Sequence, residues 1–283
     1  MTDNFRPEKG ELRLLPPAPS GFDPFTATAG DLARYGLPRR PDVATEPGLA
    51  ALWEQKASQY RNFEHLAPVA RPRPRALSPA ASGLGPDPID SCGYSLTTSS
   101  GPFTSLFITW TVPDLQFDDD AFGINSLHTF AGLGFLDVHV QLSVDLSQSV
   151  TCVLWAEAVG DVGLSVRPGD VISASLCLNT NSEGTAAYFF TNETTAQTMS
   201  FSVDTGFPPA VTVDAGVTRD DVIRSGQSLA RFGSVYFDSI SAWDSSGHQS
   251  LLSGQVINMT DTTGAVLANA YELTDYAFKV VSA

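Results

Sequence analysis

Apolar and polar residues alternate with a period of two over much of the chain after residue 90. In residues 136–146 every even position is apolar and every odd position is polar, which predicts a β-strand with one face in a core and the other toward solvent. Similar patterns predict shorter strands at 106–112, 151–159, 170–178, 186–191, 199–204, 210–213, 234–240 and 254–259. Turn sequences separate these segments, and no helical period lies between them. The pattern predicts an all-β fold, an antiparallel two-sheet β-sandwich.

Residues 1–90 follow a different pattern, because 14 of the 19 prolines lie there. So many prolines exclude uninterrupted strands and long helices. One short helix is predicted over 48–63, with Leu52, Trp53 and Tyr60 on its apolar stripe. We therefore divide the chain into a proline-rich arm, residues 1–90, and a β-sandwich domain, residues 91–283.

The arm ends in a basic, extended segment that contains Arg71, Arg73 and Arg75. We expect the arm to pack back on its own sandwich or on a neighbouring copy, with the helix as its apolar anchor and the arginines against surface carboxylates. A solubilising linker is the alternative interpretation of the basic segment.

Charge narrows the classes of partner. The chain of 283 residues has 31 acidic and 16 basic residues, a formal charge of −15 and a pI near 4.4. A protein with this negative charge is not expected to bind nucleic acids or anionic membranes. No apolar run reaches the 18 residues of a membrane span, and no secretory signal is evident. These features predict a cytoplasmic protein, or one that is exported by an unconventional route.

Neither a metal nor a cofactor is predicted. The four histidines, His65, His128, His139 and His248, have no pairwise ligand spacing. The chain also lacks a phosphate-binding glycine loop, a Gly-x-Ser-x-Gly elbow and a His-Glu-x-x-His motif. Three cysteines allow at most one disulfide, and buried free thiols are the simpler interpretation.

Two polar residues in predicted strands are candidates for acid–base chemistry. Gln141 lies on the polar face of the strand at 136–146, and Glu157 lies in the following strand beside the apolar residues Ala156 and Ala158. Apolar neighbours raise the pKa of a carboxylate, which is a property of catalytic acids and bases. A glutamate that simply points to water is the alternative.

The order of several motifs resembles the glutamic peptidases, or eqolisins (peptidase family G1). The motifs are Trp110-Thr111-Val112-Pro113, the strand with Gln141, the strand Trp155-Ala156-Glu157, and Gly169-Asp170-Val171-Ile172, and the likeness extends over about residues 100–242. The resemblance implies a concanavalin-like sandwich that hydrolyses polypeptide substrates at acidic pH. It also implies that Glu157 activates water and that Gln141 stabilises the tetrahedral intermediate.

Substrate binding is expected at Phe130, Asp137, His139 and Trp155. Phe130 begins the run that corresponds to a cleft-lining segment of the family, in which a tryptophan and an aspartate are missing here. Asp137, on the same face as Gln141, is a candidate replacement for that aspartate. A second hypothesis follows from these losses: a non-catalytic sandwich with a degenerate cleft that binds other molecules or copies of itself. In a peptidase, the arm would serve as a prosegment.

Overall fold

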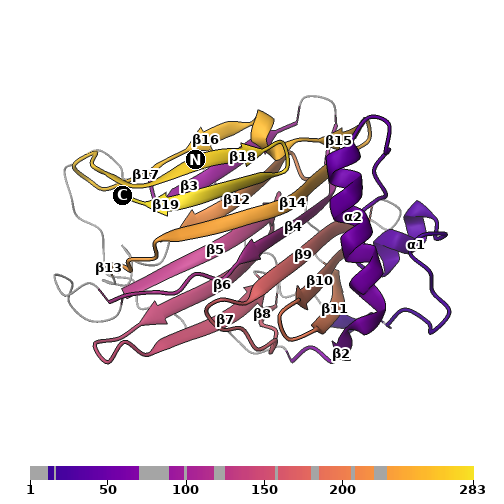
Figure 1. Cartoon of the computed structure of the whole chain (residues 1–283), viewed down its shortest axis with the longest axis horizontal. Helices are drawn as coiled ribbons and strands as arrows, with labels where there is room; N and C mark the ends of the chain where they lie inside the picture. Colours follow the sequence, from indigo (N-terminus) through magenta and orange to yellow (C-terminus); the bar gives the residue numbers. More distant parts are fainter. Residues whose placement is uncertain are drawn as a thin grey trace.

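The structure is a computed structural model that describes residues 12–15, 17–69, 89–98, 101–117, 125–156, 159–179, 185–204, 208–219 and 228–283. Two mainly antiparallel sheets, here called sheet A and sheet B, pack face to face (Figure 1). None of the helices in the described part has the length and apolar composition that crossing a bilayer requires. The predicted fold class, an antiparallel two-sheet β-sandwich, is confirmed.

Sheet A has the strand order β1-β11-β10-β9-β4-β14-β19-β18-β17, with β15 beside β14 and β2 beside β11. The bounds are β1 Leu12–Leu14, β2 Glu64–Leu66, β4 Phe103–Thr111, β9 Val171–Asn179, β10 Thr185–Asn192, β11 Gln197–Asp204, β14 Ser234–Asp244, β15 Gly247–Gln249, β17 Met259–Thr260, β18 Val266–Thr274 and β19 Ala277–Ser282. The arm supplies β1 and β2, which both pair with β11.

Sheet B has the order β16-β3-β12-β5-β6-β7-β8, with β13 beside β5. The bounds are β3 Ser91–Thr97, β5 Asn125–Leu133, β6 Leu136–Val144, β7 Val150–Ala156, β8 Gly160–Asp161, β12 Thr212–Thr218, β13 Ser228–Leu229 and β16 Gln255–Ile257. A single apolar core lies between the two sheets, and the even-numbered residues of β6 contribute to it: Val138, Val140 and Leu142 have no exposed surface. The alternation that predicted this strand is therefore confirmed.

Two tight hairpins fix the register of β5, β6 and β7. The turn between β5 and β6 is Gly134-Phe135, and Gly134 has φ +63°, a conformation that glycine adopts without steric cost. Between β6 and β7, Asp145 Oδ1 accepts hydrogen bonds from the backbone N–H groups of Ser147 at 2.9 Å and Ser149 at 3.1 Å. This turn lies where the sequence predicted it.

The arm forms two helices, α1 Ala29–Arg34 and α2 Pro47–Gln59, and two short 3₁₀ turns occur at Tyr60–Asn62 and Leu251–Ser253. Helix α2, predicted over 48–63, lies across the outer face of sheet A (Figure 1). Its Trp53 is 4% exposed and donates a hydrogen bond from Nε1 to Pro38 O at 2.8 Å. The expected packing of the helix on its own sandwich is thus observed, whereas Arg71, Arg73 and Arg75 lie outside the described residues.

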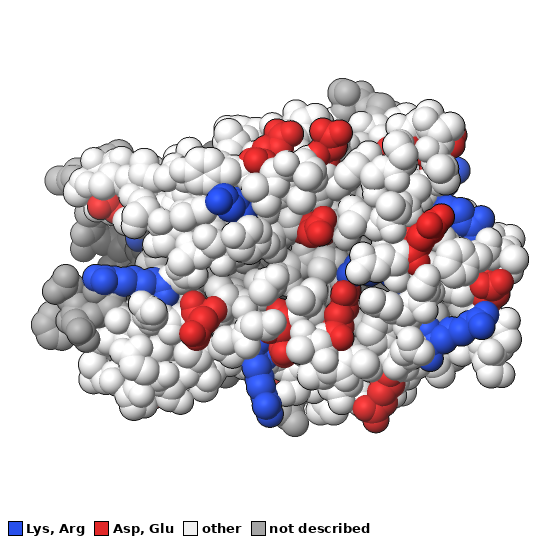
Figure 2. Space-filling view, in the orientation of Figure 1, with Lys and Arg blue, Asp and Glu red and all other residues white. Residues whose placement is uncertain are grey.

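The net charge is not concentrated on the face that carries α2. Figure 2 shows acidic and basic side chains interspersed over this face. The three cysteines are free thiols, of which Cys92 is buried and Cys152 and Cys177 are half-buried.

Candidate active site

The outer face of sheet B, which points away from sheet A, carries most of the residues that the sequence singled out. The register of β12, β5, β6 and β7 places their outward residues in three successive rows across the sheet. The first row is Asp214, Gly132 and Asp137; the second is Gly216, Phe130, His139 and Trp155; the third is Thr218, His128, Gln141 and Val153.

Two carboxylates converge over the glycine of the first row. A Cβ atom at position 132 would lie 2.3 Å from Asp214 Oδ1 and 2.6 Å from Asp137 Oδ1. The two oxygens therefore cannot be farther apart than the sum of these distances. Because residue 132 has no side chain, the two carboxylate oxygens can occupy the space that a Cβ atom would fill. Asp137, predicted from sequence as a substrate-binding residue, is thus one half of a carboxylate pair.

Asp214 is half-buried, and this burial raises its pKa to about 6. Its carboxylate has no hydrogen bond or ion pair within the described part of the chain. Two neighbouring carboxylates resist being ionised together, so such a pair readily holds one proton and one negative charge. In that state one carboxyl group can donate a proton while the other accepts one, which is the arrangement that acid–base hydrolysis needs.

The second row is a ladder of stacked rings. The ring of His139 is parallel to that of Trp155, with an interplanar angle of 1° and centroids 4.0 Å apart, and it also stacks on Phe130 at 5.8 Å. His128 packs edge-on against His139 at 5.8 Å. Phe130 and His139 are half-buried, whereas Trp155 is only 3% exposed. The structure therefore brings together three of the predicted substrate-binding residues, and it places Trp155 as a support for His139.

Gln141 lies outward in the third row and is half-buried. Its register partners are His128 on β5 and Val153 on β7. It lies four positions after Asp137 along β6, which corresponds to about 13 Å in an extended strand. Glu157 lies outside the described residues, so the predicted pairing of Gln141 with Glu157 stays a prediction.

Sequence reasoning missed Asp214 as a functional residue. The available signal was a single carboxylate in the apolar strand Val213-Asp214-Ala215-Gly216-Val217, the same kind of signal that pointed to Glu157. Its neighbour Asp137 is on a different hairpin, far away in the sequence, and only the register of three strands brings the two together.

No three His, Cys, Asp or Glu side chains within the described ranges come together as the ligands of a metal ion would. The fold and the carboxylate pair together define the class of protein: a β-sandwich with two close carboxylates on the outer face of one sheet.

Comparison with known proteins identifies the family. Residues 90–280 match the model of the Peptidase A4 family. The chain therefore belongs to the Peptidase A4 family, that of the glutamic peptidases or eqolisins, and is a hydrolase of the glutamic peptidase type. A comparison with curated protein sequences found no match.

Solved structures share the fold. Scytalido-glutamic peptidase with a transition state analog inhibitor is 15% identical, with a TM-score of 0.55, and the match covers 69% of this chain and 98% of that chain. SCP-B, described as a member of the eqolisin family in complex with the tripeptide Ala-Ile-His, is 14% identical, with a TM-score of 0.53 and the same coverage of both chains.

Proposed function

We propose that this protein is an acid-acting endopeptidase that cleaves polypeptides on the outer face of sheet B, with Asp137 and Asp214 as its acid–base pair. The observation that carries this proposal is the convergence of the two carboxylates over Gly132. Membership of a peptidase family supports the reaction class.

The pair can support each proton transfer of peptide hydrolysis. In the first step the ionised carboxylate takes a proton from water, and the water oxygen forms a bond to the peptide carbonyl carbon. The protonated carboxyl group, which the raised pKa assigns to Asp214, donates its proton to the carbonyl oxygen. In the second step the amide nitrogen receives a proton from the first carboxyl group, the C–N bond breaks, and the hydroxyl proton of the intermediate returns to the second carboxylate.

Substrate side chains would contact the ring ladder beside the pair. Phe130 and His139 are half-buried and lie one row from Asp137, whereas the buried Trp155 holds the ring of His139 flat. An extended peptide that follows the strands would present alternate side chains to this face. We propose Phe130 and His139 as the residues that contact substrate.

The assignment from sequence, Glu157 as the base with Gln141 as the oxyanion donor, is the alternative within the same function. The two assignments can be distinguished because they place an essential carboxylate at different residues, Asp214 or Glu157. Replacement of a carboxylate by its amide keeps the shape of the side chain but removes proton transfer.

The deciding experiment measures cleavage of an unfolded protein between pH 2 and pH 7 by the wild type, Asp214→Asn and Glu157→Gln, with Asp261→Asn, in a turn after β17, as the control. We expect Asp214→Asn to lose at least 100-fold in kcat, with Glu157→Gln and the control close to wild type. Loss in Glu157→Gln alone would favour the sequence assignment. Absence of cleavage by the wild type at every pH would favour the non-catalytic binding module.

A further inference from the structure

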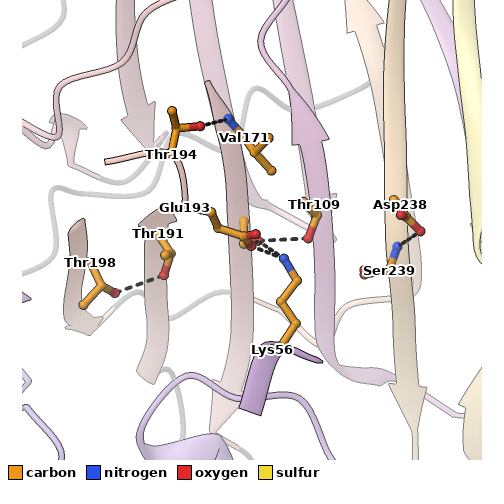
Figure 3. A network of polar contacts seen from close by, with 10 residues as sticks. Lys56, Thr109, Val171, Thr191, Glu193, Thr194, Thr198, Asp238 and Ser239 are labelled. Carbon is orange, nitrogen blue, oxygen red and sulfur yellow. Dashed lines mark hydrogen bonds and ion pairs between the residues drawn. The ribbon is translucent and has the colours of Figure 1, made fainter. Parts of the chain in front are cut away.

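A buried cation from the arm lies in a polar site on the outer face of sheet A (Figure 3). Lys56 of α2 forms an ion pair with Glu193, and its Nζ donates a hydrogen bond to Ser173 Oγ at 3.0 Å. Ser173 in turn donates to Glu193 and lies 2.9 Å from Thr109 Oγ1. The side chains of Lys56 and Glu193 are only 14% and 17% exposed.

An irregularity in β14 shapes one side of this site. The register between β14 and β4 shifts between Asp238 and Ser241, and Ser239 has φ +55°, which is unusual for a residue other than glycine. The backbone N–H of Ser239 donates to Asp238 Oδ1 at 2.6 Å. Asp238 also attracts the charge of Lys56 and so raises its pKa, although desolvation by burial is the larger effect and lowers that pKa overall.

The fit between helix and sheet is close. A cavity of only about 10 Å³ remains where Lys56 and Trp53 of α2 meet Phe107 and Ser241 of sheet A. A buried ammonium group without a partner is strongly unfavourable, so Lys56 is tolerated here because a carboxylate and a hydroxyl group compensate it.

We propose that Glu193, Ser173 and Asp238 form a binding site for a primary ammonium group, which Lys56 fills and which holds the arm on sheet A. This site is separate from hydrolysis, because it lies on sheet A and the pair Asp137–Asp214 lies on sheet B. The ion pair of Lys56 with Glu193 therefore holds the arm in addition to its other contacts.

The charged groups that face Lys56 are Glu193 after β10, Asp238 on β14 and Arg39 before α2, which lines the same small cavity. Removal of the Glu193 charge would leave the buried cation without its ion-pair partner, so docking of α2 depends on that charge.

A second titratable contact lies at the start of α2, where His248 Nδ1 and Glu46 Oε1 are 2.5 Å apart. Burial lowers the pKa of His248 and Glu46 opposes this effect, so a change of pH also changes the charge of that contact. Acid alone therefore does not isolate the ammonium site, and substitutions at neutral pH are needed.

The first test measures hydrogen exchange of residues 47–59 at pH 7 in Lys56→Met and Glu193→Gln, with Lys279→Met, a lysine elsewhere on sheet A, as the matched control. We expect exchange in α2 to be at least tenfold faster in the first two variants, with β6 protected as in the wild type. Wild-type exchange of α2 in both variants would overturn the proposal.

The second test asks whether the site binds a free ammonium group. Lys56→Ala shortens the side chain, and we expect added propylammonium, but not tetramethylammonium, to restore the slow exchange of α2 at pH 7. The rescue should be lost in the Lys56→Ala, Glu193→Gln double variant. Equal effects of both cations, or no rescue in a folded variant, would contradict a specific ammonium site.

Discussion

Asp214 acquires its chemistry from its position and not from its sequence neighbourhood. On an exposed strand an aspartate is ionised above about pH 4. Here desolvation by burial raises its pKa to about 6, and Gly132 allows its carboxylate to lie close to that of Asp137. With this raised pKa, Asp214 keeps its proton at acidic pH and can serve as the general acid in the proposed hydrolysis of a peptide bond.

The raised pKa also has a consequence for stability. Because the folded-state pKa lies above the ordinary value, the stability that protonated Asp214 provides is present below about pH 4 and is lost as the pH rises through about 6. The Asp214→Asn variant has no titrating carboxyl group at this position, so its free energy of unfolding does not fall with pH for this reason. We expect the free energy of unfolding of the variant, relative to the wild type, to increase by about 2 kcal/mol between pH 4 and pH 7.

Urea unfolding at the two pH values measures this difference. In the control, Asp261→Asn, the difference from the wild type should not increase between pH 4 and pH 7, because hydrogen bonds from Thr263 and neighbouring backbone groups lower the pKa of Asp261. If the difference between Asp214→Asn and wild type were the same at pH 4 and pH 7, Asp214 would have an ordinary pKa and could not be the acid.

The direction of a side chain was predicted correctly where the alternation of apolar and polar residues alone determines it. Asp137, His139 and Gln141 were assigned to one polar face of a strand, and the structure places all three outward. The partnership of Asp137 with Asp214 was not predictable, because Asp214 follows Asp137 by 77 residues and the two meet only through the pairing of both β6 and β12 with β5, which no local pattern encodes.

At the level of elements, the hairpin of β5 and β6 sets the geometry of the pair. The two-residue turn Gly134-Phe135 makes Leu133 oppose Leu136, so Gly132 must oppose Asp137. The register of β12 then adds Asp214 on the other side of the same glycine. A shift of one residue in either ladder would turn one carboxylate toward the core.

Gly132→Ala tests this arrangement. The new methyl group would lie within 3 Å of both carboxylate oxygens, as the distances of 2.3 and 2.6 Å show, and the two side-chain ends can move apart to admit it. We expect kcat to fall at least tenfold while the melting temperature changes by only a few degrees. Unchanged kcat, measured together with thermal unfolding, would show that the close approach of the two carboxylates is not needed for hydrolysis.

Elements with clear alternation were predicted, and elements without it were missed. The patterns identified β4, β6, β9 and β11 to within a few residues. In contrast, β5 is buried on both faces for most of its length, so its sequence Asn-Ser-Leu-His-Thr-Phe-Ala-Gly-Leu shows no period of two. Strand β18 has the opposite character, because most of its residues are half-buried or exposed.

On the scale of the whole molecule, the described helices and strands of the arm lie on sheet A, whereas the carboxylate pair lies on sheet B. In its described residues the arm covers part of the outer face of sheet A, extends the edge of sheet A through β1 and β2, and reaches β8 where the N–H of Val69 donates to Val162 O at 3.0 Å. We propose that this part of the arm acts as a clamp on the sandwich. A prosegment that blocks the pair would have to do so through other residues.

Trp53→Ala tests how much of the clamp depends on apolar contacts. The indole is buried, is hydrogen-bonded to Pro38 and lies beneath Arg40, whose guanidinium is 5.0 Å from the ring centroid. We expect the substitution to weaken docking of α2 by about 3 kcal/mol, so that limited proteolysis cuts the arm before the sandwich. An arm that resists protease as well as the wild type does would show that Trp53 contributes little to docking.

The pH dependence of kcat/KM for cleavage of one peptide substrate tests the central claim most directly, namely that Asp214 is the acid of a carboxylate pair. We predict a bell-shaped profile in the wild type whose basic side falls with a midpoint near pH 6, where Asp214 loses its proton. In Asp214→Asn this basic side should be absent from the small remaining activity. A wild-type profile that stays level from pH 5 to pH 7, or one that Asp214→Asn leaves unchanged, would contradict the assignment.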